Sequence, residues 1–189
     1  MINKQQFDSI TKALFPVVDK RNNEPSILNV YAIIDGAMVK GLRKKLKKDN
    51  PEYCCLWAGS LAPDLQSVAP YLVKLTVDCP FYHWLINSGW GQDWNIFVQS
   101  VYEFKQLRKH LRQFLLVEDP EGETVVFRYY DPAVMNTFST VCTPQQALII
   151  YHNVTYLCSA FLDGQVNLIK HYLSAEKTLV SNETISLGR

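Results

Sequence analysis

The sequence predicts an α/β protein with a mixed, mostly three-layer sheet, flanking helices and a C-terminal β-hairpin. Three observations support this class. Short runs of β-branched and aromatic residues alternate along the chain with segments of helical periodicity. Hydrophobic residues make up 48% of the 189 residues and aromatic residues 12%, so a sizeable core can form. Near the C-terminus, two apolar runs flank Asp163-Gly164, a dipeptide typical of a hairpin turn.

The first half of the chain predicts alternating helices and strands. Phe7, Ile10 and Leu14 have helical spacing and predict a helix over residues 3–15. The apolar run at 27–34 predicts a strand that is covered on both faces. The next expected elements are a helix from Ala37 to about Lys48, strands over 53–58 and 71–76, and a helix over 80–89 bounded by Pro80 and Gly89.

The second half continues this alternation and ends in strands. Its clearest helix carries apolar residues at three- and four-residue spacing, with basic residues on the other faces. The expected elements are a strand over 94–100, a helix over 104–115, a strand over 124–130, a helix over 131–141, a helix from Thr143-Pro144, and a hairpin of 154–162 with 165–173.

One main domain with a C-terminal addition is expected. Residues 1–150 are expected to form the α/β domain, residues 151–174 a hairpin extension, and the polar residues 175–189 a flexible tail. The hairpin either joins the main sheet or forms a small annex beside it.

Composition indicates a soluble, cytoplasmic protein. The net charge of +1 gives no strong field toward nucleic acid or a membrane surface. No apolar run approaches the roughly 18 residues of a spanning helix, and the N-terminus is too polar for a signal peptide. The five cysteines include no CxxC pair, which is typical of reduced thiols.

The sequence lacks the motifs of the common enzyme classes. It contains no HExxH, GxSxG, Walker or GxGxxG pattern, and its four histidines are scattered. A non-catalytic protein with no metal or cofactor is therefore expected. A small hydrolase that uses Cys142 and His152 stays open as an alternative, because their distance in space is not readable from the sequence.

Two junctions, "YAIIDGA" and "FRYYDPA", share an aspartate between an apolar strand and a helix. Asp35 and Asp131 are expected to cap the helices that follow, and Pro132 suits the first helical position. If Arg128 lies in a covered strand with Val126 and Tyr130 on its face, its guanidinium needs a carboxylate. Asp35 or Asp131 is the expected partner.

Two other stretches could bind a partner. The basic run at 40–48 suits an exposed helix face, or else a docking patch for an acidic surface or a nucleic acid; its candidate residues are Arg43, Lys44, Lys47 and Lys48. The aromatic stretch around "NSGWGQDW" is expected to be core, or, if part is exposed, a contact surface that includes Trp84 and Trp90.

The segments "YAIIDGA", "SVAPYLVKL", "SGWGQDWNIFVQS" and "LRKHLRQFLLVEDPEGETVVFRYYDPAVM", in this order, resemble the type VI secretion effector-chaperone, or adaptor, family. The resemblance covers about residues 28–146. The positions that match the family's marks are Asp35, Ala69, Pro70, Leu72, Trp94, Leu111, Arg112, Phe127, Arg128, Tyr130, Asp131 and Pro132.

The resemblance implies a non-catalytic protein that binds one toxic effector, often through an N-terminal or PAAR-linked region, and helps to load it onto the VgrG spike. A one-to-one complex with an effector encoded nearby is expected, with strand addition to an open sheet edge as one binding mode. Many family members carry a longer second lobe, whereas only about 40 residues follow the matched region here.

Overall fold

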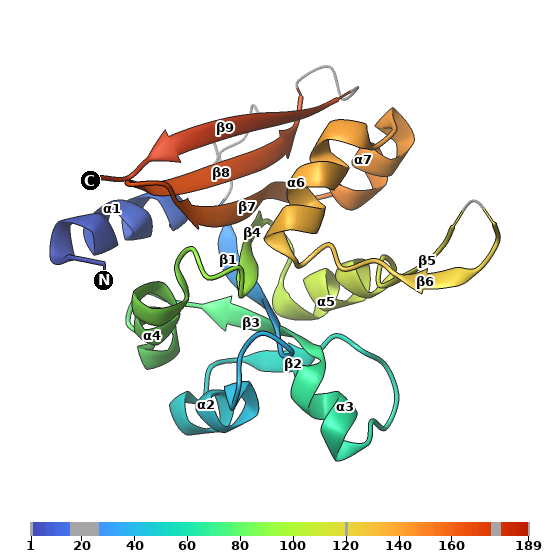
Figure 1. Ribbon diagram of the computed structural model, residues 1–189, viewed down its shortest axis with the longest axis horizontal. Helices are drawn as coiled ribbons and strands as arrows, with labels where there is room; N and C mark the ends of the chain where they lie inside the picture. The colour runs from blue at the N-terminus through green and yellow to red at the C-terminus, as the bar shows by residue number, and fades with distance from the viewer. Residues whose placement is uncertain (1, 16–26, 120, 175–178, 189) are drawn as a thin grey trace.

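A computed structural model describes residues 2–15, 27–119, 121–174 and 179–188 (Figure 1). Helices and strands alternate through most of the chain, and strands close it. The elements are α1 (Lys4–Leu14), β1 (Asn29–Asp35), α2 (Leu42–Asp49), β2 (Tyr53–Cys55), α3 (Pro63–Val68), β3 (Pro70–Leu75), α4 (Pro80–Gly89), β4 (Asn95–Ser100), α5 (Phe104–Arg112), β5 (Leu116–Glu118), β6 (Thr124–Val126), α6 (Pro132–Val141), α7 (Pro144–Ile150), β7 (Val154–Leu162), β8 (Val166–Leu173) and β9 (Val180–Ser186).

A seven-stranded sheet in the order β2-β3-β1-β4-β7-β8-β9 forms the centre of the protein. Each of its described pairings is antiparallel. The hairpin of β7 and β8 joins this sheet beside β4, so the C-terminal strands extend the main sheet and do not form a separate annex. The expected α/β class with flanking helices and a C-terminal hairpin is confirmed, but the main sheet is antiparallel in all its described pairings and not mixed in strand direction.

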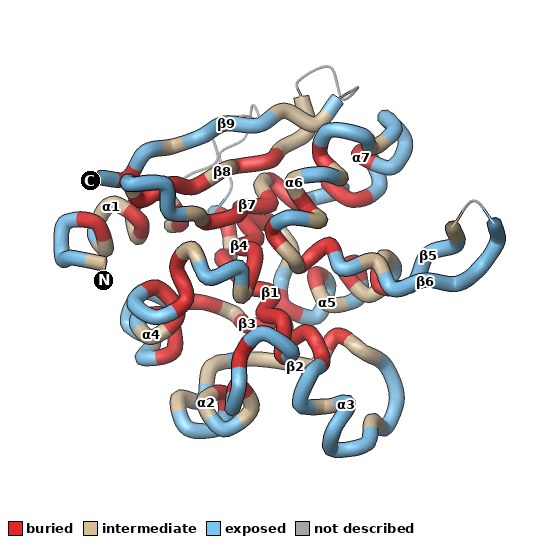
Figure 2. The backbone as a smooth tube through the Cα atoms, viewed as in Figure 1, coloured by how far each residue is buried: buried red, intermediate tan, exposed pale blue. Residues whose placement is uncertain are grey.

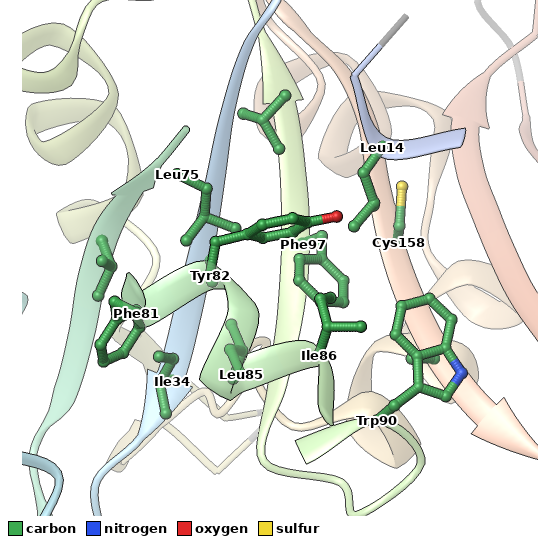
Figure 3. Packing of buried hydrophobic residues seen from close by; sticks show 14 of the residues in the cluster. Leu14, Ile34, Leu75, Phe81, Tyr82, Leu85, Ile86, Trp90, Phe97 and Cys158 are labelled. Carbon is green, nitrogen blue, oxygen red and sulfur yellow. The ribbon is translucent and has the colours of Figure 1, made fainter. Parts of the chain in front are cut away.

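Helices cover the sheet on both faces because its central strands are apolar on both sides. Val30 and Ile34 of β1 share one core cluster with residues of α1, α2 and α4. Tyr31 and Ile33, which point the other way, share a second cluster with residues of α5, α6 and α7. Figure 3 shows α4 packing over the first face, and Figure 2 shows the buried residues concentrated along the sheet. The result is the expected three-layer arrangement.

The largest differences from the expected element boundaries concern α2 and β6, while β2 and α5 end three residues early, at Cys55 and Arg112. Residues 37–41 form turns, and α2 begins only at Leu42, because Gly41 has a φ of 80° that ends any helical run before it. The strand expected over 124–130 ends at Val126. It does not join the main sheet; β6 pairs only with β5, in a separate hairpin that projects from the body (Figure 1). We call this hairpin, residues 116–126, the arm.

The C-terminal residues also differ from the expectation of a flexible tail. Residues 180–186 form β9, which pairs with β8 along its whole length and is the outermost strand of the sheet. The polar sequence of β9, "VSNETIS", lacks the apolar residues that predict a strand, because much of this edge strand is exposed to water. Residues 175–178 and 189, which belong to the same expectation, lie outside the described residues.

A buried polar network joins β9 and α6 to the sheet. His171 of β8 is 1% exposed, and its Nδ1 lies 2.6 Å from Asn182 Oδ1 of β9 and 3.0 Å from Ser139 Oγ of α6. Its Nε2 lies 3.3 Å from Ser159 Oγ of β7, which donates to Asn136 Oδ1. Four elements therefore meet at one imidazole ring.

Stability should fall as the pH drops below about 6.5, the ordinary pKa of histidine. Burial lowers the pKa of His171, against the opposing effect of its hydrogen bond with Asn182, so the unfolded chain binds the proton more readily. Replacing His171 with Gln should destabilise the protein by about 1–3 kcal/mol at neutral pH and flatten this decline. Urea unfolding at a series of pH values measures both effects.

His83→Gln is the matched control, because His83 is an exposed histidine outside this network. His110, whose pKa is also lowered by burial, contributes to the decline in both variants. An unchanged pH slope in His171→Gln would contradict the assignment to this network.

Candidate partner-binding site

Asp35, at the end of β1, is a buried carboxylate with partners on both oxygens. Its side chain is 3% exposed. Oδ1 accepts a hydrogen bond of 2.8 Å from the backbone N–H of Ala37, and Oδ2 accepts one of 2.7 Å from Arg128 Nη2. Arg128 also lies 3.4 Å from Asp131 Oδ2. The expected pairing of Arg128 with these aspartates is confirmed.

The guanidinium of Arg128 connects the two strand-to-helix junctions, "YAIIDGA" and "FRYYDPA", which lie far apart in the sequence. Asp131 caps α6 by accepting the N–H of Ala133 at 2.9 Å, and Pro132 occupies the first turn. Asp35 lies at the end of a central strand, whereas Asp131 begins a covering helix. Arg128 therefore ties α6 to the sheet, and we call Asp35, Arg128 and Asp131 the Arg128 junction.

The expected strand geometry around Arg128 is wrong, although the pairing is right. The N–H of Phe127 donates to the carbonyl of Leu115, which is the last contact of the arm, and residues 129–130 form a turn. The side chains therefore do not alternate, and the adjacent Tyr129 and Tyr130 are both buried. The turn leaves Arg128 46% exposed on its outer side.

Several other predicted positions converge on the end of β1. Pro70 is the register partner of Asp35 in β3, and the carbonyl of Trp94 accepts the Asp35 N–H at 2.9 Å. Gly36 allows the close approach of the next segment, because a Cβ there would lie 2.4 Å from the carbonyl oxygen of Ala69. These residues fix the path of the chain as it leaves the sheet.

Arg112 and Tyr130 also have structural contacts. Arg112 Nη2 donates to the carbonyls of Cys55 and Trp57 at 3.2 and 2.9 Å, which ties α5 to the edge strand β2. Tyr130 is 3% exposed within the second core cluster. The matched positions thus hold the fold together around α5, α6 and the sheet.

The surface that this framework presents is apolar and hollowed. A pocket of about 300 Å³ opens between the segment that follows α5, the arm, α6 and α7. A second pocket, of about 430 Å³, opens along α6. Phe127 and Phe138 line both, with ring centroids 5.2 Å apart. We call the two pockets the arm groove; the first is lined by Phe114, Val117, Glu118, Phe127, Phe138, Gln146, Ile149 and Ile150, and the second by Phe127, Ala133, Val134, Thr137, Phe138 and Val141.

Large hydrophobic side chains are exposed beside the groove. Val141 at the end of α6 is 72% exposed and Ile149 of α7 is 48% exposed. The arm exposes apolar residues along both of its strands, as the pale blue colour of Figure 2 shows; they are Leu116, Val117, Val125 and Val126. Contiguous exposed apolar surface of this kind marks protein-interaction sites. No signal in the sequence marks the groove, because its residues come from separate segments of the chain.

The structure places the other predicted surfaces elsewhere. Leu42 and Leu46 of α2 face the core, and Lys44, Lys47 and Lys48 are exposed while Arg43 is half-buried, so this basic face is available for docking. Trp90 is 4% exposed and belongs to the core, so the idea that it forms part of a contact surface is wrong. Trp84 is half-buried against Trp94, with ring centroids 5.6 Å apart.

The alternative hydrolase site would require Cys142 to act as a nucleophile. Burial raises the pKa of Cys142, which disfavours the thiolate form that a nucleophile needs. The His152 ring lies 6.2 Å from that of Tyr102 and 6.5 Å from that of His110. In the described ranges no cluster of three or more His, Cys, Asp or Glu residues could hold a metal ion.

Residues 30–148 match the family described as "Domain of unknown function (DUF4123)". The match includes all of β1 but its first residue, the Arg128 junction and the arm groove except Ile149 and Ile150, and it spans more than half of the chain. The chain belongs to the DUF4123 family. Comparisons with curated proteins and with solved structures gave no significant match. Within the described part of this DUF4123 protein, no helix has the length and apolar character to cross a membrane.

Replacing Arg128 with Met should destabilise the DUF4123 domain, because it leaves the buried Asp35 carboxylate without its cation. Since Arg128 is 46% exposed, water screens part of the interaction, and we expect a loss of about 1–2 kcal/mol. Chemical unfolding of Arg128→Met, Asp35→Asn and the double variant should give a coupling energy of at least about 0.5 kcal/mol.

Lys44→Met, which removes an exposed cation from α2, serves as the control and should leave stability unchanged. Strictly additive effects of the two junction variants would show that the ion pair does not stabilise the fold.

Proposed function

We propose that this DUF4123 protein is a cytoplasmic adaptor that binds one type VI secretion effector and promotes its loading onto the VgrG spike. It does so without catalysis, by holding an apolar segment of the effector, such as its N-terminal or PAAR-linked region. Family membership supports this proposal, since the DUF4123 family is associated with adaptors of this secretion system.

The arm groove is the observation that carries the proposal. An adaptor needs a surface where apolar groups meet water in the free protein and meet the partner in the complex. The groove presents such a surface, and the family's own "FRYYDP" segment supplies one of its two central rings, Phe127. The buried neighbours of that ring, Tyr129 and Tyr130, anchor the segment in the core.

Capture of the tagged protein from its native cells, followed by mass spectrometry, tests the proposal. We expect one large effector to co-purify in near-equimolar amount, with or without VgrG. The same tag on an unrelated protein of similar size is the control. A tagged protein that recovers no effector, or only nucleic acid, would contradict the adaptor function.

Deletion of the gene should abolish secretion of the captured effector, because an unloaded effector does not leave with the spike. Secretion of the structural spike proteins should continue, and the intact gene supplied in trans should restore export. Quantification of effector in the culture medium measures the result. Undiminished secretion in the deletion strain would contradict a loading role.

A further inference from the structure

The charges that sum to +1 are unevenly distributed along the chain. The basic face of α2 lies at the β2 end of the sheet, away from the arm (Figure 1). In contrast, Arg128 is the only Lys or Arg between residues 113 and 151. Its positive charge is already paired with Asp35 and Asp131 in the Arg128 junction. The arm, α6 and α7 therefore carry more carboxylates than free cations, and the nearest basic residue to the groove by shared lining is Lys109 of α5, which lines another pocket with Ile149.

The carboxylates of this part lie at the end of the arm and beside the groove. Glu118, Glu121 and Glu123 are exposed, and Glu118 also lines the first pocket of the groove. Asp119 has a structural role, because its Oδ1 accepts the N–H groups of Glu121 and Glu123 at 3.0 and 2.8 Å. These bonds order the backbone at Glu121 and Glu123, and the arm contains no Lys or Arg that could neutralise its glutamates.

The arm is built in a way that favours a covering partner. A two-stranded hairpin is only marginally stable in water by itself, and each arm strand has three residues. Its register pairs Leu116 with Val126 on one face and Val117 with Val125 on the other, so apolar side chains project from both faces. Covering them removes apolar surface from water and stabilises the hairpin.

We propose that the arm groove binds an amphipathic helix of the partner. The apolar face of the helix enters the two pockets, and Lys and Arg residues beside that face meet the glutamates of the arm. This inference rests on the proposed function, because it assigns a site and a chemical character to the effector segment that the adaptor holds.

The shape of the groove favours a helix over an added strand. Strand addition needs a long open edge of backbone N–H and C=O groups, whereas the arm edges are three residues long. The groove is lined by side chains, and its two pockets share the Phe127–Phe138 pair as lining. Two neighbouring hollows suit apolar residues one helical turn apart, at three- or four-residue spacing.

Reversal of the arm charges tests the electrostatic part of the proposal. The triple variant Glu118→Lys, Glu121→Lys, Glu123→Lys should weaken binding of the captured effector at least about tenfold at low salt. This difference from the wild type should shrink as salt rises from about 50 mM to about 500 mM. Calorimetric titration of purified adaptor with purified effector measures it, and Lys44→Glu, Lys47→Glu, Lys48→Glu on α2 is the matched control.

Removal of apolar side chains tests the groove itself. The variant Val141→Ser, Ile149→Ser changes one exposed residue of each pocket and should weaken binding about tenfold or more while leaving thermal stability nearly unchanged. Leu65→Ser, Val68→Ser on α3 is the control, because these apolar residues are similarly exposed but lie outside the groove. The control should bind like the wild type.

Overlapping peptides of about 20 residues from the effector identify the bound segment. The binding peptide should have apolar residues at helical spacing, flanking Lys and Arg, and helical circular dichroism in the complex. Wild-type affinity in both the arm charge-reversal variant and the Val141→Ser, Ile149→Ser variant would overturn the proposal while leaving the adaptor function standing. A bound segment that is acidic or extended would do the same. A wild-type protein that captures no effector would instead overturn the proposed function.

Discussion

The fold of this DUF4123 protein depends on how a buried carboxylate at the end of a central strand is neutralised. Asp35 is almost inaccessible to water, and an unpaired charge in that position would be costly. Arg128 supplies the cation from 93 residues further along the chain and reaches the cap of α6 with the same guanidinium. One side chain thus fixes a covering helix relative to the sheet. Its own partial exposure makes the pair less costly to form than a fully buried one.

This constraint links the architecture of the protein to its surface. The segment that carries Arg128 leaves the arm at Phe127 and enters α6 at Pro132, so the junction holds the arm, α6 and their shared groove in one arrangement. The family's matched residues are mostly buried or committed to internal contacts. They form a frame, and the groove beside that frame consists of exposed side chains such as Val141 and Ile149, which can differ between proteins without altering the frame.

Local signals in the sequence predicted much of the fold and one long-range contact. The cap at Asp131 follows from residue type and position, and the need for a partner at Arg128 follows from the cost of burying its charge. The expected cap at Asp35 is wrong, because Asp35 accepts the N–H of Ala37 in a turn and α2 begins only at Leu42, after Gly41. The end of β6 was missed because "FRYY" has the composition of a strand but turns into the core. Strand β9 was missed because its sequence is polar at a sheet edge. The groove was not predictable, since separate elements supply Phe114, Phe127, Phe138 and Ile149 and no periodic pattern marks exposure across them.

Amide hydrogen exchange of Arg128→Met, compared with the wild type, tests most directly whether the junction holds the partner-binding surface in place. If it does, protection should fall in α6, in α7 and in the arm, while β7 and β8 in the main sheet keep their wild-type exchange. Unchanged exchange in α6 and the arm, or an equal loss across the whole sheet, would contradict the view that Arg128 positions the groove.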